Sequence, residues 1–436
     1  MLKGLRNIHL FLGAVMMMVA GASCASEEPG TGTAGEEADA ENVVDGVPGE
    51  VVLEIGTGGW ENIAGGGETR ADVSNSSFSN THHVREIWLY IFGGTGQDAT
   101  CLYTEQVPYW SDLYPVETEP QTGYTPSEGL HEHRLTSKLA AATTYRIVAV
   151  GIDNFTDGSG TTAESNKDNP YGLPKSITVN KTTYKEAIAK LADTKTQADI
   201  ANSELFGGEC VVTTSQVGAV FAHIDLYRRF AGVEVWLKNI PKTIYAKVDH
   251  SDDGVDNGAW EDATVDHVNV ECYTALNGSV ALAPIVGTDI YTYSDFVYNP
   301  LKEQGDVLHG DGHYLNMILS ISINHDTEHE SSSLAQGTYP PREAHTYILP
   351  VAAPHSDFRQ STLRLMFYDK DGHILRSNMI LEANPESGLG NESARYPLRA
   401  NHVYSIGSKE RPIDLRSHAD EIIVIGAWQE DVEITI

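Results

Sequence analysis

Basic residues are scarce in this chain, and the shortage limits its partners. The 436 residues include 29 Lys and Arg against 61 Asp and Glu, which gives a formal net charge of −32. This balance disfavours nucleic acid and anionic membrane surfaces, because both attract basic proteins. It fits a soluble protein on a cell exterior, although a solvated acidic surface with no specific partner would give the same count.

Cysteine is also rare. Of the four cysteines, three lie in the body of the chain, namely Cys101, Cys210 and Cys272. Their spacing matches no zinc site, and an odd number in an exported protein leaves at least one without a disulfide partner. A Cys101–Cys210 disulfide is one pairing that this count allows.

Motifs for catalysis or cofactor binding are missing as well. The sequence has no G-x-S-x-G elbow, no P-loop and no dinucleotide-binding glycine pattern. His325–His329 has Asp326 where a zinc protease needs glutamate, and Asp153–Glu164 has Phe155 where a calcium loop needs an oxygen ligand. Both stretches are better explained as polar loops. We therefore predict no enzyme, no catalytic residue, no metal and no cofactor; an exported hydrolase would need an acid/base set dispersed over the fold.

Long apolar runs are absent after the first residues. Leu10–Ala20 is apolar, follows Lys3 and Arg6, and leads into three small residues before Cys24. We expect residues 1–23 to be a lipoprotein signal peptide and Cys24 to be the acylated residue; an ordinary secretory signal cut near Ser23 is the alternative. Residues 24–49 are rich in Asp, Glu, Gly and Pro and contain no Lys or Arg, so we expect an acidic disordered linker.

The body of the chain has the pattern of a β protein. Apolar alternation or β-branched runs predict strands at 51–55, 84–92, 145–152, 224–240, 315–323, 403–406 and 421–427. Leu363–Leu375 predicts a hairpin around Asp371-Gly372. One helix is expected at Thr183–Ala192, where Thr183 and Glu186 have the spacing of a capping box. Without βαβ alternation, the pattern favours a mainly-β fold of two antiparallel β-sandwich domains, residues 50–217 and 218–436.

Two stretches near the ends of the sequence share one pattern. Val51, Leu53 and Ile55 alternate with other residues, and so do Val432, Ile434 and Ile436. We call Val51–Ile55 the leader strand. An apolar terminal strand is an aggregation hazard unless something covers it, and a strand from another subunit could take the place of the leader strand by β-strand addition.

We expect a protease site between the leader strand and the rest of the body. The stretch "GGGETRADV" (65–73) places Arg70–Ala71 just after three glycines, where an exposed loop would admit a trypsin-like protease. Cleavage there would release residues 50–70. Val432–Ile436 of another subunit would then act as the donor strand, and repetition would give a head-to-tail polymer.

The ordered set of motifs resembles the Bacteroidetes fimbrillins, the type V pilins of the FimA/Mfa kind. The motifs that carry it are the signal ending at Cys24, the acidic linker, "EVVLEIGTGG", "TRA", "VREIWLYIFGG", "LYRRFAGVEVWLKNIP" and "LRANHVYSI". The resemblance implies two transthyretin-like domains with one or a few short helices, and export to the outer membrane as a lipoprotein carrying palmitate. It also implies cleavage by an arginine-specific protease and polymerisation with other pilin subunits into a surface fimbria for cell adhesion.

A second interpretation is a monomeric surface lipoprotein that binds glycan or protein through a β-sandwich face. Trp60, Trp88, Tyr109 and Trp110 are its candidate sugar-stacking residues, although aromatic side chains on strands more often pack in a core. Limited proteolysis followed by polymerisation would separate the two interpretations.

Overall fold

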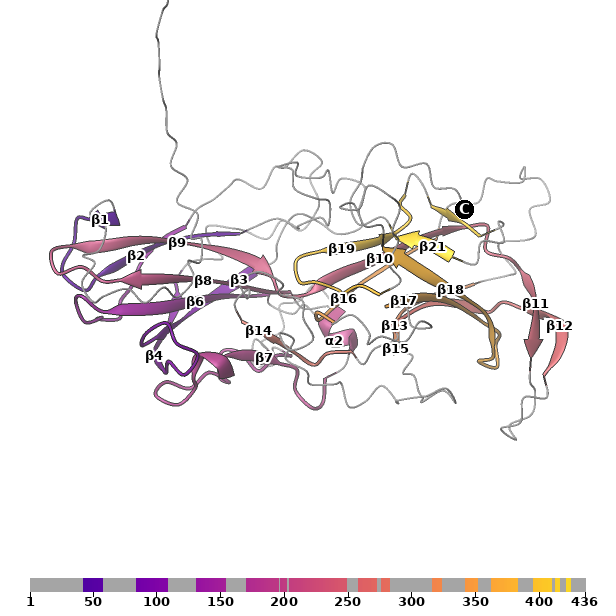
Figure 1. Ribbon diagram of the computed structural model, residues 1–436, viewed down its shortest axis with the longest axis horizontal. Coiled ribbons are helices and arrows are strands. Elements are labelled where there is room, and N and C mark those ends of the chain that lie inside the picture. The colour runs from indigo at the N-terminus through magenta and orange to yellow at the C-terminus, as the bar shows by residue number, and fades with distance from the viewer. Residues whose placement is uncertain are drawn as a thin grey trace, which may run out of the picture. The chain divides into compact units, whose positions relative to one another are not determined.

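The computed structural model has a mainly-β fold, as the sequence predicted (Figure 1). The structure describes residues 42–57, 84–108, 131–153, 170–195, 197–201, 204–248, 258–272, 276–282, 316–323, 342–351, 362–382, 395–409, 412–415 and 421–424.

The first eight-stranded sheet has the order β4-β3-β6-β8-β9-β2-β5, with β1 also paired to β9. Its strands are β1 (Val43–Val44), β2 (Val51–Thr57), β3 (Val84–Phe92), β4 (Cys101–Val107), β5 (His131–Arg134), β6 (Thr144–Asp153), β8 (Leu205–Thr213) and β9 (Ala219–Arg228). β8 and β9 share only two residue pairs, Phe206–Arg228 and Gly207–Tyr227. On either side of this short β8–β9 junction the sheet forms one layer: β4-β3-β6-β8 on one side and β1-β9-β2-β5 on the other.

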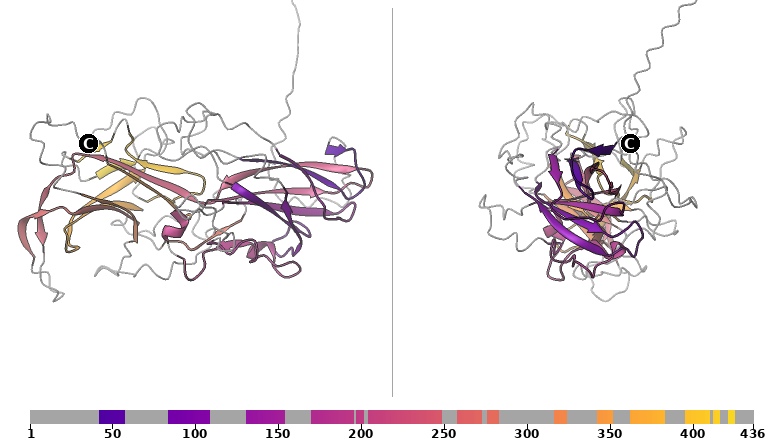
Figure 2. Two further views of the ribbon diagram at one scale, coloured as in Figure 1. Left: turned by 180° about the vertical axis from the view of Figure 1, so that it is seen from behind. Right: turned by 90° about the vertical axis from the view of Figure 1, so that its left-hand side faces the viewer.

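The core of this sandwich lies between the layers. Leu53 from β2 and Ile224 from β9 share one buried cluster with Leu89 from β3, Ile147 from β6 and Cys210 from β8. These strands can meet in one cluster because the β1-β9-β2-β5 layer faces the β4-β3-β6-β8 layer. Figure 2 shows the same strands from behind, with the indigo β1 and β2 beside the pink β9.

The outer face of β3 is buried as well. Tyr90 and Phe92 belong to a second cluster, which also contains Tyr171, Leu173 and Ile177 from the chain segment before β7 (Ile188–Lys190). Burial on both faces explains why "VREIWLYIF" is almost continuously apolar and aromatic instead of alternating.

Most of the described strands after β9 form a second sandwich. One sheet has the order β16-β10-β19 with β20 on β10, and the other has the order β15-β13-β17-β18-β21. Their strands are β10 (Ala231–Lys238), β16 (Arg342–Ile348), β19 (Val403–Ile406), β20 (Ile413–Asp414), β13 (His267–Cys272), β15 (Asn316–Ser322), β17 (Leu363–Tyr368), β18 (Ile374–Glu382) and β21 (Glu421–Val424). Val233 and Val235 of β10 pack in one cluster with Val268 of β13 and Leu365 of β17.

Two small sheets complete the β structure of the described residues. β11 (Thr243–Val248) and β12 (Ala259–Thr264) form an antiparallel pair. β7 pairs with β14 (Ser279–Ala281), so residues from the first and second halves of the sequence meet in one sheet.

The helix predicted at Thr183–Ala192 is wrong. Only a 3-10 turn forms, at Tyr184–Glu186, and it is followed directly by strand β7. The capping interaction does exist, because the carboxylate of Glu186 accepts hydrogen bonds from the backbone N–H (3.0 Å) and hydroxyl (2.8 Å) of Thr183. Pairing of β7 with β14 overrides the local helical signal. A five-residue helix, α2, lies later, at Gln197–Ala201.

The long strand predicted at Ile224–Ile240 is two strands. β9 ends at Arg228 and β10 begins at Ala231. Phe230 between them is fully buried. β9 pairs with strands of the first sandwich and β10 with strands of the second. The chain therefore passes from one sandwich to the other after Arg228, later than the predicted domain boundary between residues 217 and 218. The division into two domains stays a prediction.

The cysteines do not form the Cys101–Cys210 pair. Within the described residues, Cys101, Cys210 and Cys272 are all buried thiols. Each lies in a different hydrophobic cluster. Cys101 faces the outer side of the β4-β3-β6-β8 layer while Cys210 faces the core.

Candidate functional site

The predicted leader strand is an internal strand of the first sandwich. β2 lies between β9 and β5 and pairs with β9 in parallel, from Val51–Val220 to Thr57–Leu226. It pairs with β5 in the antiparallel sense, from Val52–Arg134 to Ile55–His131. In the described part of the chain, β5 has no other strand partner. Both edges of β2 are therefore used, and β5 depends on β2 for its strand pairing.

The inner face of β2 is completely buried. Val51, Leu53 and Ile55 each have 0% exposure and belong to the core cluster of the first sandwich. As an upper bound, their burial contributes about 1.5–3 kcal/mol each. The three side chains whose alternation predicted this strand therefore lie together on one face. That this strand is removed in the working protein stays a prediction.

The outer face of β2 carries one charged residue, Glu54, next to the buried Val52. Glu54 lies 3.1 Å from Nδ1 of His223 on β9, and Nε2 of the same ring lies 2.8 Å from the carboxylate of Asp225. Glu132 of β5 is the other cross-strand neighbour of Glu54. These groups are partly exposed, so we expect each ion pair to contribute little to stability.

The chain before β2 contacts the other edge of β9. β1 pairs with Ala219 and Val220, and the backbone N–H of Gly49 donates to the carbonyl of Ser215 at 3.1 Å. A Cβ at Gly46 would overlap the Ala219 side chain. Residues 43–57 therefore pair with β9 along both of its edges.

An ion pair marks the start of β2. The carboxylate of Glu50 lies 2.7 Å from the guanidinium of Arg134 on β5. The hydrogen bond from Arg134, with a second from the backbone of Val47, lowers the pKa of Glu50. This exposed contact orients the beginning of the strand and adds little energy.

A buried pair joins the free edges of the two layers. Nε2 of His133 on β5 lies 2.8 Å from the carboxylate of Glu105 on β4. The same carboxylate accepts hydrogen bonds from the backbone N–H groups of Thr136 (2.9 Å) and Ser137 (3.1 Å), and from the Ser137 hydroxyl (2.9 Å). β5 is thus held on one side by β2 and on the other by Glu105. No local sequence pattern indicates this contact, because the two residues are 28 positions apart and lie on different strands.

Several predicted residues fall outside the described residues. They are Cys24, Arg70, Ala71, Val432, Ile434 and Ile436, together with the aromatic candidates Trp60, Tyr109 and Trp110. The loop after Asp153 and the His325–His329 stretch do so too. Trp88 is described: it is half-buried on β3, and its Nε1–H donates to Glu86 at 3.2 Å. Trp88 packs against the second cluster, on the outer face of β3. It is therefore a core residue rather than a sugar-stacking platform.

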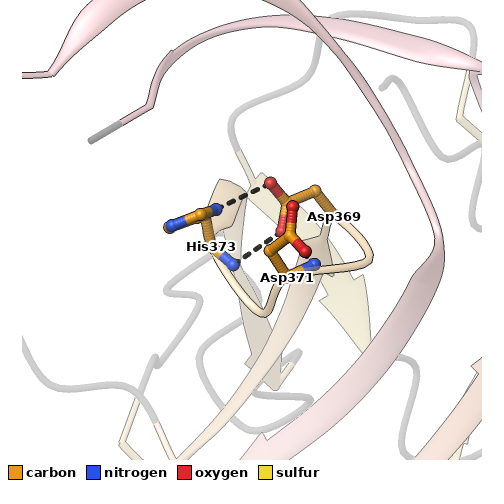
Figure 3. Close-up of side chains that lie close together, drawn as sticks. All are labelled: Asp369, Asp371 and His373. Atoms are coloured by element: carbon orange, nitrogen blue, oxygen red, sulfur yellow. Dashed lines mark hydrogen bonds and ion pairs between the residues drawn. The ribbon is translucent and has the colours of Figure 1, made fainter. Parts of the chain in front are cut away.

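One group of possible metal ligands occurs in the described residues, at the β17–β18 turn. Ligand atoms of Asp369, Asp371 and His373 lie within 4.8 Å of one another. Oδ1 of Asp369 accepts the backbone N–H groups of Asp371 (2.9 Å) and His373 (2.8 Å), while Oδ2 lies 2.8 Å from Nδ1 of His373 (Figure 3). Lys370 Nζ contacts both carboxylate oxygens of Asp371 at 2.7 Å.

These contacts account for the cluster as a stabilised turn. Burial acts to raise the pKa of Asp369, but the hydrogen bonds from His373 and the backbone lower it overall. A charged Asp369 bonded to two backbone N–H groups is the usual chemistry of a tight turn. Gly372, with φ of +87°, supplies the left-handed residue that the predicted Asp-Gly turn requires.

None of the helices in the described part of the chain has the length and hydropathy to cross a bilayer. No protein-family model matches the chain, and no curated protein matches it either.

Solved structures do match. A fimbrial assembly protein from Parabacteroides distasonis is 11% identical over 83% of this chain and 90% of its own, with a TM-score of 0.33. The tip fimbrial protein Mfa3 from Porphyromonas gingivalis is 10% identical over 82% and 93%, with a TM-score of 0.33. The fimbrial anchor protein Mfa2 from the same organism is 12% identical over 76% and 82%, with a TM-score of 0.32. All three structures are described as fimbrial proteins, and each is at most 12% identical to this chain.

Proposed function

We propose that this protein is a structural subunit of a surface fimbria, made as a lipoprotein and assembled by strand exchange. A protease cuts Arg70–Ala71 and the leader strand leaves. The apolar strand Val432–Ile436 of another subunit then takes its place. The subunits join head to tail, and the lipid on Cys24 holds each one at the outer membrane until the cut separates it from the body.

The observation that supports this proposal is the position of β2. It is the first long strand in the described residues, and it fills an internal position between β9 and β5 with a fully buried inner face. Its loss would expose the backbone groups of β9 along the register from Val220 to Leu226. An open strand edge beside an apolar groove is the kind of surface that β-strand addition fills.

The position of the cut suits this scheme. Arg70 falls between the end of β2 at Thr57 and the start of β3 at Val84. Cleavage there would separate the leader strand from the body without cutting any strand in the described residues. The strand would still be held by its burial, about 5–9 kcal/mol as an upper bound for the three inner side chains. We therefore expect the cut leader to leave slowly unless a donor strand competes for its place.

Limited digestion of the purified full chain tests the proposal. The chain carries Cys24→Ser to keep it soluble and is treated with a trypsin-like protease, followed by N-terminal sequencing and size-exclusion chromatography. A new terminus at Ala71 and a ladder of oligomers are expected. Arg70→Ala should prevent both, whereas Arg85→Ala, a matched control close to the start of β3, should prevent neither.

Deletion of Val432–Ile436 separates cleavage from assembly. This variant should be cut at Ala71 and remain monomeric. Oligomers that form equally well without the last five residues, or a cut protein that stays monomeric with its leader still bound, would contradict strand exchange. The second result would favour the monomeric surface lipoprotein.

A further inference from the structure

The β11–β12 hairpin has two different faces. Ala246 and Val248 of β11 and Ala263 of β12 point inward and belong to the core of the second sandwich. The opposite face carries Tyr245, which pairs with Asp262, and Lys247, which pairs with Trp260. Because the inward residues attach the hairpin to the core, the outer face is not needed for that attachment.

Two aromatic rings lie next to each other on this outer face. Tyr245 is 65% exposed and Trp260 is 63% exposed. Their ring centroids are 5.5 Å apart with an interplanar angle of 22°, so the rings are stacked. Among the large hydrophobic side chains that are exposed in the described residues, the only other aromatic one is Tyr103, at 37%. Cross-strand aromatic pairs do stabilise hairpins, but that role does not require both rings to remain so open to solvent.

The groups around the rings indicate the class of ligand. The ammonium of Lys247 and the carboxylate of Asp262 lie on the same face, each directly across from one of the rings. Flat apolar rings flanked by donors and acceptors match a sugar ring, which has C–H groups on its faces and hydroxyls at its rim. Two side chains are far too small an area for a stable protein interface. The net charge of −32 disfavours anionic ligands.

We propose that the Tyr245–Trp260 face binds neutral hexose units of a glycan. None of the aromatic candidates selected from the sequence lies on this hairpin. The proposed site does not depend on strand exchange, and it would operate in a monomer or in a polymer. It gives the protein a binding activity separate from its structural role.

A glycan array tests the site. The full chain, Trp260→Ala, Tyr245→Ala and the control Tyr103→Ala are applied to neutral oligosaccharides of mannose, glucose and galactose, with sialylated and sulfated sugars beside them. The wild-type protein and Tyr103→Ala should retain neutral glycans. The affinity of Trp260→Ala for them should be at least about tenfold lower. Trp260→Phe, which keeps an aromatic ring, should recover part of the binding and shows that loss in the alanine variant is not caused by unfolding.

Three results would overturn the proposal. One is that the wild-type protein retains no neutral glycan at millimolar sugar. Another is that Trp260→Ala binds as well as wild type, which would place any sugar site elsewhere. The third is retention of sialylated or sulfated sugars alone. None of these results affects the digestion experiment on Arg70, so the two proposals can fail separately.

Discussion

His133 and Glu105 form a buried pair that connects β5 to β4, with Nε2 2.8 Å from Oε1 and less than a tenth of either residue exposed. Replacing Glu105 with alanine would leave His133 and two backbone N–H groups without their acceptor. We expect Glu105→Ala to lower the free energy of unfolding by about 2–4 kcal/mol. Chemical denaturation of both proteins measures this, with the exposed Glu132→Ala as a control expected to change stability by less than about 0.5 kcal/mol.

The same pair predicts a dependence on pH. Burial acts to raise the pKa of Glu105, but hydrogen bonds from His133, Thr136 and Ser137 outweigh it and lower the pKa from 4.5 to about 2. A folded-state pKa below the unfolded one means that the ionised form stabilises the fold. The contribution is present above pH 4.5 and is lost as the pH falls through about 2. The stability difference between wild type and Glu105→Gln should therefore shrink between these pH values; a constant difference would contradict the assignment.

The two faces of β2 should respond differently to truncation. Leu53 is fully buried, so Leu53→Ala should cost about 2–5 kcal/mol of unfolding free energy. Glu54 lies on the opposite face and is partly exposed, so Glu54→Ala should cost less than about 1 kcal/mol. Thermal and urea unfolding of the uncut chain measure both. Equal effects would mean that β2 is not packed as described.

Much of the β structure could be predicted from the sequence. "VREIWLYIF" forms β3 over the predicted residues, and the Asp371-Gly372 turn lies between β17 and β18. These segments follow from local pattern, because β-branched and aromatic residues fit strands and glycine fits the left-handed turn position. The buried face of β2 was also visible, as the alternation of Val51, Leu53 and Ile55.

Long-range pairing was not predictable. The parallel pairing of β2 with β9 joins Val51 to Val220, and no local pattern specifies a partner so far along the chain. The helix prediction at 183–192 failed for the same reason, since the capping box formed but Ile188–Lys190 was recruited by β14. The aromatic pair on β11–β12 was missed because Tyr245 and Trp260 meet only when the hairpin register is known.

The buried thiols should be unreactive in the folded protein. Cys101 is fully buried, and burial raises the pKa of its thiol to about 11, so little thiolate forms at neutral pH. With Cys24→Ser, an aromatic disulfide reagent should react with almost no thiol in buffer and with three thiols in denaturant. Fewer than three in denaturant without reductant would indicate a disulfide and contradict the three separate buried sites.

Gly207 permits the closest approach between β8 and the segment after β14. A Cβ at this position would overlap the backbone carbonyl oxygen of Leu282. Backbone cannot move away as a flexible side chain can, so Gly207→Ala should destabilise the protein by more than about 3 kcal/mol or prevent folding. Gly96→Ala is the matched control: a Cβ there meets nothing within 4 Å, and the stability of this variant should differ from wild type by less than about 0.5 kcal/mol.

Soluble yield and thermal unfolding of the two variants, expressed in parallel, measure the difference. If Gly207→Ala is as stable as Gly96→Ala, then β8 and residue 282 are not in contact in solution, and the junction between the first sandwich and the β7–β14 sheet is looser than described.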